Sequence, residues 1–372
     1  MGSAGATLLG TFSGATGEIR EAGFEYATSA AQLDGNATKV YDDTCLGNVA
    51  SGSISADITS LSLSTTYYYR AFVLEYNQST LQYEYHYGSV RSFTTTDHVT
   101  APPSGWLELP ATTGSEDYVG VFYGEGGTTE EYRNYSYNYS YTYYASLWTA
   151  YPLKKAHTTG NASTSSWHYN PYIDQDYQVS ITKNSYGTMY GNDTYSRGHQ
   201  CPNADRKSDD TMNRQTYYAT NQTPQIQLNF NQGIWSSLEE AERNLVSSNA
   251  NEVVYVVTGP AYRTVGGNET ISYLTGATGK NANPTQLPIP NYYWKAFLKV
   301  KWDGDNVTSA SAIGFWLQHK TYSNSFTNYA VSVDDIEQMT GFDLFTNLPG
   351  DNFSGIEKTA EANTNWTAFQ NF

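Results

Sequence analysis

The sequence is poor in charged side chains, and it lacks a long apolar run. Charged residues make up 15% of its 372 residues, and 36 acidic against 20 basic residues leave a net charge of −16. This balance argues against a protein that covers nucleic acid with a broad basic face, although an enzyme needs only a local positive site. No apolar stretch reaches 18 residues, so the sequence predicts no transmembrane helix.

Cysteine is also scarce. It occurs only at Cys45 and Cys201, which we place in different domains, so we expect no disulfide between them. Cys201 is interpreted as a small buried apolar residue rather than a nucleophile. Residues 1–5 are neither basic nor followed by an apolar stretch, so we expect no signal peptide in this chain.

Aromatic residues are abundant, with 34 tyrosines in an aromatic share of 15%. Tyrosine-rich strands joined by short polar loops account for this mixture, so the chain reads as β-rich. Segments that alternate with the period of a strand and end at turn residues are 6–12, 22–26, 52–58, 66–73 and 89–94. Their spacing predicts an all-β sandwich over residues 1–97. Residues 61–71 and 88–95 resemble a fibronectin type III-like module of bacterial surface proteins.

A proline-containing segment follows, with Pro102 and Pro103. We predict a linker over residues 98–115 and a second domain over residues 116–372. Residues 131–144 carry tyrosine at nearly every odd position, which places the rings on one face of a strand. Such a strip can stack on unpaired bases, but a strand packed on its neighbour is the preferred interpretation.

Two stretches of the second domain concentrate the chemistry. Residues 194–206 hold Arg197 and His199, and Asn231 begins a predicted helix that runs to about residue 246 and carries Glu239. A histidine can take a proton from water, an amide oxygen can ligate Mg²⁺, and an arginine can neutralise charge on phosphate. Together these groups suit phosphodiester hydrolysis. We expect a strand at 213–221 that pairs back toward His199.

The same stretches resemble the sugar-non-specific DNA/RNA endonucleases, a Serratia nuclease-like family with a ββα-metal (His-Me finger) site. The family's Asp-Arg-Gly-His signature occurs here as Ser-Arg-Gly-His at residues 196–199. A second block follows with Asn-x-Thr-Pro-Gln at 221–225, Asn-Gln-Gly-x-Trp at 231–235 and Leu-Glu at 238–239. The resemblance covers roughly residues 145–350. It implies an α+β domain with a central antiparallel sheet and flanking helices.

This resemblance implies a metal-dependent endonuclease that acts on DNA and RNA. It places the general base at His199 and one Mg²⁺ (Mn²⁺ is an alternative) directly on Asn231, with Glu239 contacting the metal through water. Further functional positions that it implies are Arg197, Asn221 and Arg243.

Plainer interpretations of the same residues remain open. Asn231 can cap its helix, Glu239 can be an exposed carboxylate that pairs with Arg243 four residues on, and Asn221 can end its strand. The other histidines have no motif residues beside them and are expected at the surface: His86, His98, His157, His168 and His319.

The sequence departs from the family pattern at two places. Ser196 replaces the usual Asp, which we expect to be tolerated because that Asp is not the base. Residues 163–166, next to Trp167, contain no arginine where a relative carries a phosphate-facing one, so this contact is absent, supplied by Lys154 or Lys155, or supplied elsewhere.

Two other functions stay open at this point. One is a non-enzymatic surface binding or adhesion protein with a degenerate nuclease fold, and the other is a metal-dependent hydrolase of another phosphodiester. We expect a secreted, periplasmic or cell-surface bacterial protein, and the native targeting signal is not present in this chain. The sequence leaves the oligomeric state and the preference between DNA and RNA open.

Overall fold

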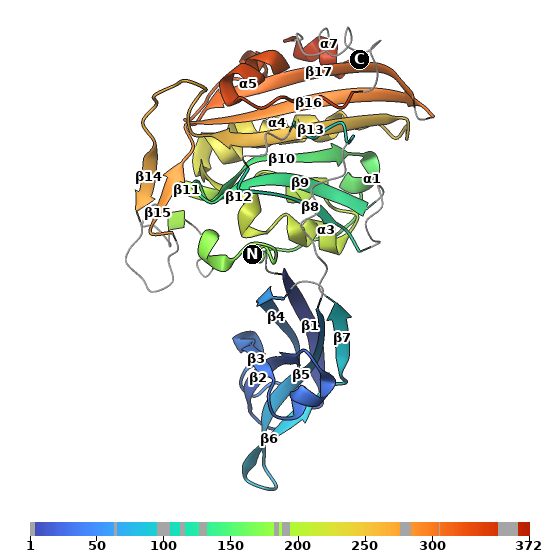
Figure 1. Ribbon diagram of the computed structural model, residues 1–372, viewed down its shortest axis with the longest axis vertical. Coiled ribbons are helices and arrows are strands. Elements are labelled where there is room, and N and C mark those ends of the chain that lie inside the picture. The colour runs from blue at the N-terminus through green and yellow to red at the C-terminus, as the bar shows by residue number, and fades with distance from the viewer. Residues whose placement is uncertain are drawn as a thin grey trace. The chain divides into compact units, whose positions relative to one another are not determined.

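The computed structural model describes residues 4–62, 65–94, 105–111, 116–125, 132–181, 186–187, 194–275, 284–304, 306–348 and 364–372. Contacts divide the chain into two compact units, Met1–Val99 with Tyr169–Gln175, and Thr100–His168 with Asp176–Phe372. Figure 1 labels the elements of both. Each unit has a hydrophobic core of its own. Cys45 and Cys201 are both buried and not disulfide-bonded, as expected.

The first unit is built from strands, which confirms the predicted all-β N-terminal region. Its strands are β1 (Ala4–Ser13), β2 (Ile19–Ala27), β3 (Thr38–Tyr41), β4 (Ser51–Leu61), β5 (Thr66–Asn77), β6 (Gln82–Tyr87) and β7 (Arg91–Thr94). β1 pairs with β4, while β3, β2, β5 and β6 form a second antiparallel sheet in which β7 also pairs with β5. Leu8 and Ile54 from one sheet share a core with Phe24 and Val73 from the other.

A seven-stranded antiparallel sheet forms the centre of the second unit, in the order β18-β17-β16-β13-β10-β9-β8. Its strands are β8 (Tyr118–Tyr123), β9 (Arg133–Ser140), β10 (Ala145–Leu153), β13 (Glu252–Ala261), β16 (Tyr292–Asp303), β17 (Asn306–Gln318) and β18 (Ala330–Val331). Two further hairpins pair β11 (Tyr195–His199) with β12 (Gln222–Ile226) and β14 (Ser272–Thr275) with β15 (Gln286–Ile289). The helices are α1 (Lys155–Thr158), α3 (Asp210–Gln215), α4 (Ser236–Asn244), α5 (Val333–Thr340) and α7 (Trp366–Gln370).

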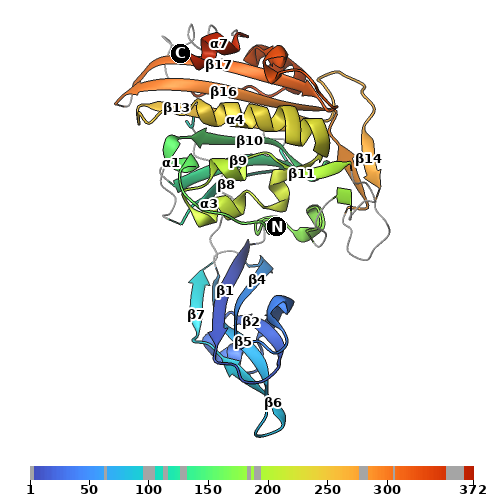
Figure 2. The ribbon, with the colours of Figure 1, turned by 180° about the vertical axis from the view of Figure 1, so that it is seen from behind.

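Strand alternation gives this sheet two differently occupied faces. On β16, Trp294 and Leu298 join a core cluster with Ile336 of α5. Tyr293 and Lys295, on either side of Trp294, point to the other face, because successive side chains of a strand alternate. Figure 2 shows α3 and α4 in front of that second face. The tyrosines of β9 are buried, which supports the packed-strand interpretation rather than an exposed stacking surface.

Two predicted elements near the site are wrong in position. Residues 213–221 do not form a strand: they include the end of α3, whose start is capped by Asp209, with its Oδ1 accepting from Met212 N at 2.7 Å. The strand that pairs with β11 begins one residue later, at Gln222. The regular helix starts at Ser236 rather than Asn231, because Gly233 adopts a non-helical conformation.

The predicted linker also needs correction where it is described. Leu107 and Leu109 are 5% and 6% exposed and belong to the core of the second unit. Between them, the buried Glu108 carboxylate lies 3.2 Å from Arg133 Nε. Residues 105–111 therefore belong to the second unit, while 98–104 and 112–115 lie outside the described residues. The domain boundaries otherwise stay a prediction.

We predict that a fragment of residues 105–372 is clearly more stable than one of residues 116–372. The shorter fragment loses Leu107 and Leu109, each contributing about 1.5–3 kcal/mol by burial, and leaves Arg133 without its carboxylate. All eight tryptophans belong to the second unit, so denaturation followed by tryptophan fluorescence reports on this unit. Equal unfolding midpoints for the two fragments would show that residues 105–115 contribute nothing.

Candidate active site

The β11–β12 hairpin brings the two motif stretches together. In its register Arg197 lies opposite Pro224 and His199 opposite Gln222. Glycine is required at position 198 of this strand pair, since a Cβ there would overlap the buried side chain of Gln225. The hairpin therefore presents His199 at the end of β11, where the strand turns into the segment before α3.

Two aromatic rings flank His199. The ring centroids of Trp167 and Tyr217 lie 4.9 and 4.7 Å from that of the imidazole. Burial lowers the pKa of His199 to about 4, so the ring is neutral at neutral pH and able to accept a proton. Its Nε2 is buried and makes no hydrogen bond to the described residues.

Asn221 is fully buried and holds the segment of the chain that follows His199. Its Oδ1 accepts from Cys201 N at 2.9 Å, and its Nδ2 donates to the carbonyls of Cys201 at 2.9 Å and Thr216 at 2.7 Å. It lies in a short turn of helix (η6, Ala219–Asn221) and not at a strand end. These bonds brace the turn that follows His199.

Arg197 lies against the same aromatic ring as the histidine. Its guanidinium carbon is 5.3 Å from the centroid of Trp167, and its Nη2 donates to Ser180 O at 3.3 Å. The residue is 8% exposed, so burial and these contacts restrict its position. Trp167 thus packs on both Arg197 and His199.

Asn231 is tied to β11 by a hydrogen bond and does not cap α4. Its Nδ2 donates to Ser196 Oγ at 3.0 Å, and Ser196 Oγ donates onward to Gln225 O at 3.4 Å. The carbonyl oxygen of Gln225 can only accept, so Ser196 Oγ donates to it and accepts from Asn231 Nδ2. Asn231 therefore turns its Oδ1 away from Ser196, as the atom available to another partner.

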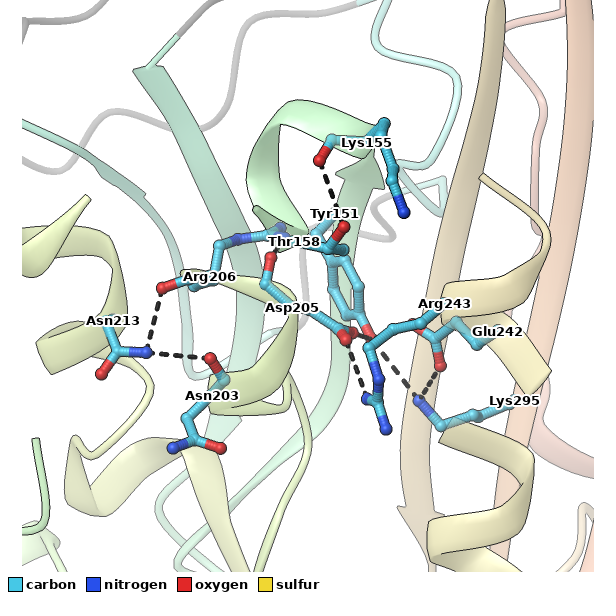
Figure 3. Close-up of polar contacts among 10 residues, drawn as sticks. All are labelled: Tyr151, Lys155, Thr158, Asn203, Asp205, Arg206, Asn213, Glu242, Arg243 and Lys295. Atoms are coloured by element: carbon cyan, nitrogen blue, oxygen red, sulfur yellow. Dashed lines mark hydrogen bonds and ion pairs between the residues drawn. The ribbon is translucent and has the colours of Figure 1, made fainter. Parts of the chain in front are cut away.

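Glu239 and Arg243 lie four residues apart on α4, but the ion pair that this spacing allows is not formed between them. Arg243 Nη1 instead lies 3.0 Å from Asp205 Oδ1 (Figure 3). Glu239 is partly buried, and burial raises its pKa to about 7. The helix dictates the common face of the two residues, whereas Asp205, the partner of Arg243, lies 38 residues away in the sequence and is brought close only by the fold.

Two histidines expected at the surface are interior groups. His157 is 6% exposed. His319 is partly buried and joins two segments: Ile226 N donates to its Nε2 at 2.9 Å, and its Nδ1 lies 2.9 Å from Pro290 O. His319 therefore anchors the last residue of β12, immediately before the segment that carries Asn231.

The sequence interpretation missed several of these supporting residues. Trp167 and Tyr217 flank the histidine, Asp205 holds Arg243, and His319 holds β12. Asp205 lies six residues after His199, within residues 194–206, but its position in the sequence does not indicate that it pairs with Arg243. Trp167, Tyr217 and His319 come from separate stretches, and the sequence does not indicate that these particular side chains contact the site.

No group of three or more His, Cys, Asp or Glu side chains that could hold a metal occurs among the described residues. Nor does any helix in the described part of the chain have the length and apolar character to cross a membrane.

The sequence profile of the DNA/RNA non-specific endonucleases matches residues 117–351, more than half of the chain. The protein belongs to this family. The chain is 28% identical to a nuclease of Serratia marcescens over 225 residues, covering 58% of this chain and 74% of the relative. It is also 28% identical over 189 residues to the mitochondrial Nuclease 1 of Schizosaccharomyces pombe, covering 50% and 56%.

A solved structure of the EndoG/EndoGI complex is also similar, with a TM-score of 0.48 and 18% identity, covering 60% of this chain and 86% of that one. The chain spans 56% of the length of the yeast Nuclease 1 and 64% of the mitochondrial nuclease EXOG of Danio rerio. The family match includes β11, β12 and α4, so all the candidate site residues lie inside it.

We predict that acid destabilises the second unit less in the His319→Gln variant than in the wild type. Burial lowers the pKa of His319 to about 4, below its ordinary value near 6.5. The unfolded chain therefore binds a proton in this window that the folded chain does not, so stability is present above about pH 6.5 and declines toward pH 4. Chemical denaturation followed by tryptophan fluorescence, repeated between these pH values, measures the slope of the unfolding free energy against pH. A slope in the variant equal to that of the wild type contradicts the assignment.

Proposed function

We propose that the protein is a divalent-metal-dependent endonuclease that hydrolyses phosphodiester bonds in DNA and RNA. One observation carries the proposal: a neutral, aromatic-flanked His199 stands on the same strand as Ser196, which holds the predicted metal ligand Asn231. The family match covers this whole arrangement. We further propose that β11, β12 and α4 form a ββα-metal unit.

The residues present fit one hard divalent cation. Asn231 offers an amide oxygen whose direction is set by Ser196, and Mg²⁺ accepts such oxygen ligands while retaining most of its waters. We assign Asn231 as the direct ligand of Mg²⁺ or Mn²⁺, with Glu239 in contact through water. When bound, the cation stabilises the negative charge that develops on the phosphate.

The side chains of this protein supply the remaining functions. We assign Nδ1 of His199 to accept the proton of a water molecule as that water attacks phosphorus. The bond between phosphorus and the leaving oxygen then breaks, and the leaving oxygen takes a proton from solvent. Arg197 and Arg243 bind phosphate oxygens, since a guanidinium pairs with them through two parallel N–H groups. Asn221 keeps the chain after His199 in place through its three hydrogen bonds to backbone atoms.

Ser196 is compatible with this site although the family usually carries Asp there. Its hydroxyl accepts from the Asn231 amide, as a carboxylate would, without adding a negative charge. The position occupied by a phosphate-facing arginine in a relative lies in residues 163–166, just before Trp167. Arg197 of β11 already lies over the ring of Trp167, and we propose that it makes the phosphate contact in place of the missing arginine.

The first unit receives a separate proposal. We propose that its two sheets form a fibronectin type III-like sandwich that acts as a spacer or adhesion module. In that case the enzyme is secreted, periplasmic or displayed at the surface of a bacterial cell. The common core of the two sheets supports this assignment.

We predict that His199→Ala lowers the cleavage rate by about 10²–10⁴-fold, the usual contribution of a general base. Nicking of supercoiled plasmid and cleavage of RNA measure it, with and without EDTA. The matched control is His86→Ala, an exposed histidine of the first unit, which should cleave like the wild type. A folded His199→Ala variant with nearly normal activity would place the base elsewhere.

We predict that Asn231→Ala lowers the affinity for Mn²⁺ more than Glu239→Gln does, because it removes the direct ligand. Ser196→Ala should also lower it, since the Asn231 amide then loses the partner that orients its oxygen. Electron paramagnetic resonance of Mn²⁺ titrated into the protein measures binding independently of activity. Asn244→Ala, an exposed residue of α4, is the control. Normal Mn²⁺ binding by Asn231→Ala refutes the assignment.

A further inference from the structure

A cluster of buried polar side chains lies beneath α4, shown in Figure 3. Tyr151 comes from β10, Asp205 from the turn η5 (Asn203–Asp205), Glu242 and Arg243 from α4, and Lys295 from β16. Tyr151 Oη donates to Glu242 Oε1 at 2.7 Å, and Lys295 Nζ donates to Glu242 Oε2 at 2.9 Å. The cluster therefore connects α4 to two strands of the central sheet.

Asp205 links this cluster to Arg243. Its Oδ1 accepts from Arg243 Nη1 at 3.0 Å, and its Oδ2 lies 3.4 Å from Tyr151 Oη. Asp205, Glu242 and Lys295 are all 0% exposed. A buried carboxylate is tolerated only where it is paired and hydrogen-bonded, and the partner of Asp205 is Arg243. The single O–H of Tyr151 is directed at Glu242, at the shorter distance of 2.7 Å.

Arg243 differs from its fully buried neighbours. Its side chain is 25% exposed, and its single hydrogen bond to the described residues is the one to Asp205. Arg206, next to the cluster, offers a contrast: it is 0% exposed, and it donates to Asn134 and Pro152. A guanidinium anchored at one nitrogen and open to solvent at the others is arranged to bind an anion with its remaining N–H groups.

We propose that Asp205 is a positioning residue for catalysis, which holds the Arg243 guanidinium at the face of α4 that also carries Glu239, ready for a phosphate oxygen of the substrate. The inference rests on the proposed function. Tyr151, Glu242 and Lys295 keep Asp205 and α4 in fixed relation to the sheet. Asp205 acts through Arg243 and touches neither substrate nor metal.

A double-mutant cycle tests this in the full chain, with Asp205→Asn, Arg243→Gln and the double variant. Misplacing a substrate-binding group by about 1 Å costs as much as about 10²-fold in rate, so we expect Asp205→Asn to lower kcat/KM by about ten- to a hundredfold. The double variant should be no slower than Arg243→Gln alone. Asp210→Asn, exposed in the first turn of α3, is the matched control.

A second measurement separates positioning from a general loss of structure. In a His199→Ala background, binding of a fluorescent single-stranded oligonucleotide is followed across salt concentrations. Loss of one phosphate contact reduces the slope of log affinity against log salt by about 0.7. We expect this reduction in Arg243→Gln and also in Asp205→Asn. Tyr151→Phe, a milder change, should shift both readouts in the same direction if Asp205→Asn proves unstable.

The outcomes are distinguishable. Multiplying losses in the double variant, or an unchanged salt slope in Asp205→Asn together with a lowered unfolding midpoint, would assign Asp205 a purely structural role and overturn the inference. Absence of cleavage by the wild type would refute the proposed function instead. The binding experiment would in that case still report whether Asp205 controls the phosphate contact of Arg243.

Discussion

Antiparallel pairing of β11 with β12 is the interaction on which the candidate site depends. It places His199 at the end of β11, and Asn231 follows five residues after Ile226, the last residue of β12. Each end of the hairpin is secured separately: Asn221 binds the backbone beyond His199, and His319 accepts the last amide of β12. Because these anchors are buried or partly buried hydrogen bonds, losing one leaves a polar group without its partner and costs more than the bond itself contributes.

Buried charge is the second constraint. α4 has only a short apolar stripe, with Leu238 fully buried, and it is held to the sheet in part by Glu242 and Lys295. Two carboxylates and two cations meet there, so the cluster is close to neutral although it lies inside the fold. Such a set adds little net stability over apolar packing. Its value in this protein is that it directs one cation, Arg243, outward.

Charge is distributed unevenly between the whole protein and its site. The chain has a net charge of −16, yet the residues assigned to phosphate binding are two arginines whose positions are restricted by Trp167 and by Asp205. A few fixed cations in an acidic protein favour a local contact over broad electrostatic adhesion, and broad adhesion would make release of a polyanionic product slow. Acidity in the bulk and phosphate chemistry at the site are therefore compatible.

Sequence alone determined the family, the β-rich character and the strands of the core, because alternation and ordered motifs are local signals. It also indicated the residues of the motif, from His199 to Glu239. It did not determine where α4 begins, since Gly233 and its neighbours interrupt the winding in a way that periodicity does not show. Nor could it reveal that Arg243 pairs with Asp205, that Trp167 and Tyr217 enclose His199, or that residues 105–111 belong to a core. Those contacts join segments far apart in the chain, and only tertiary packing decides which distant side chains meet.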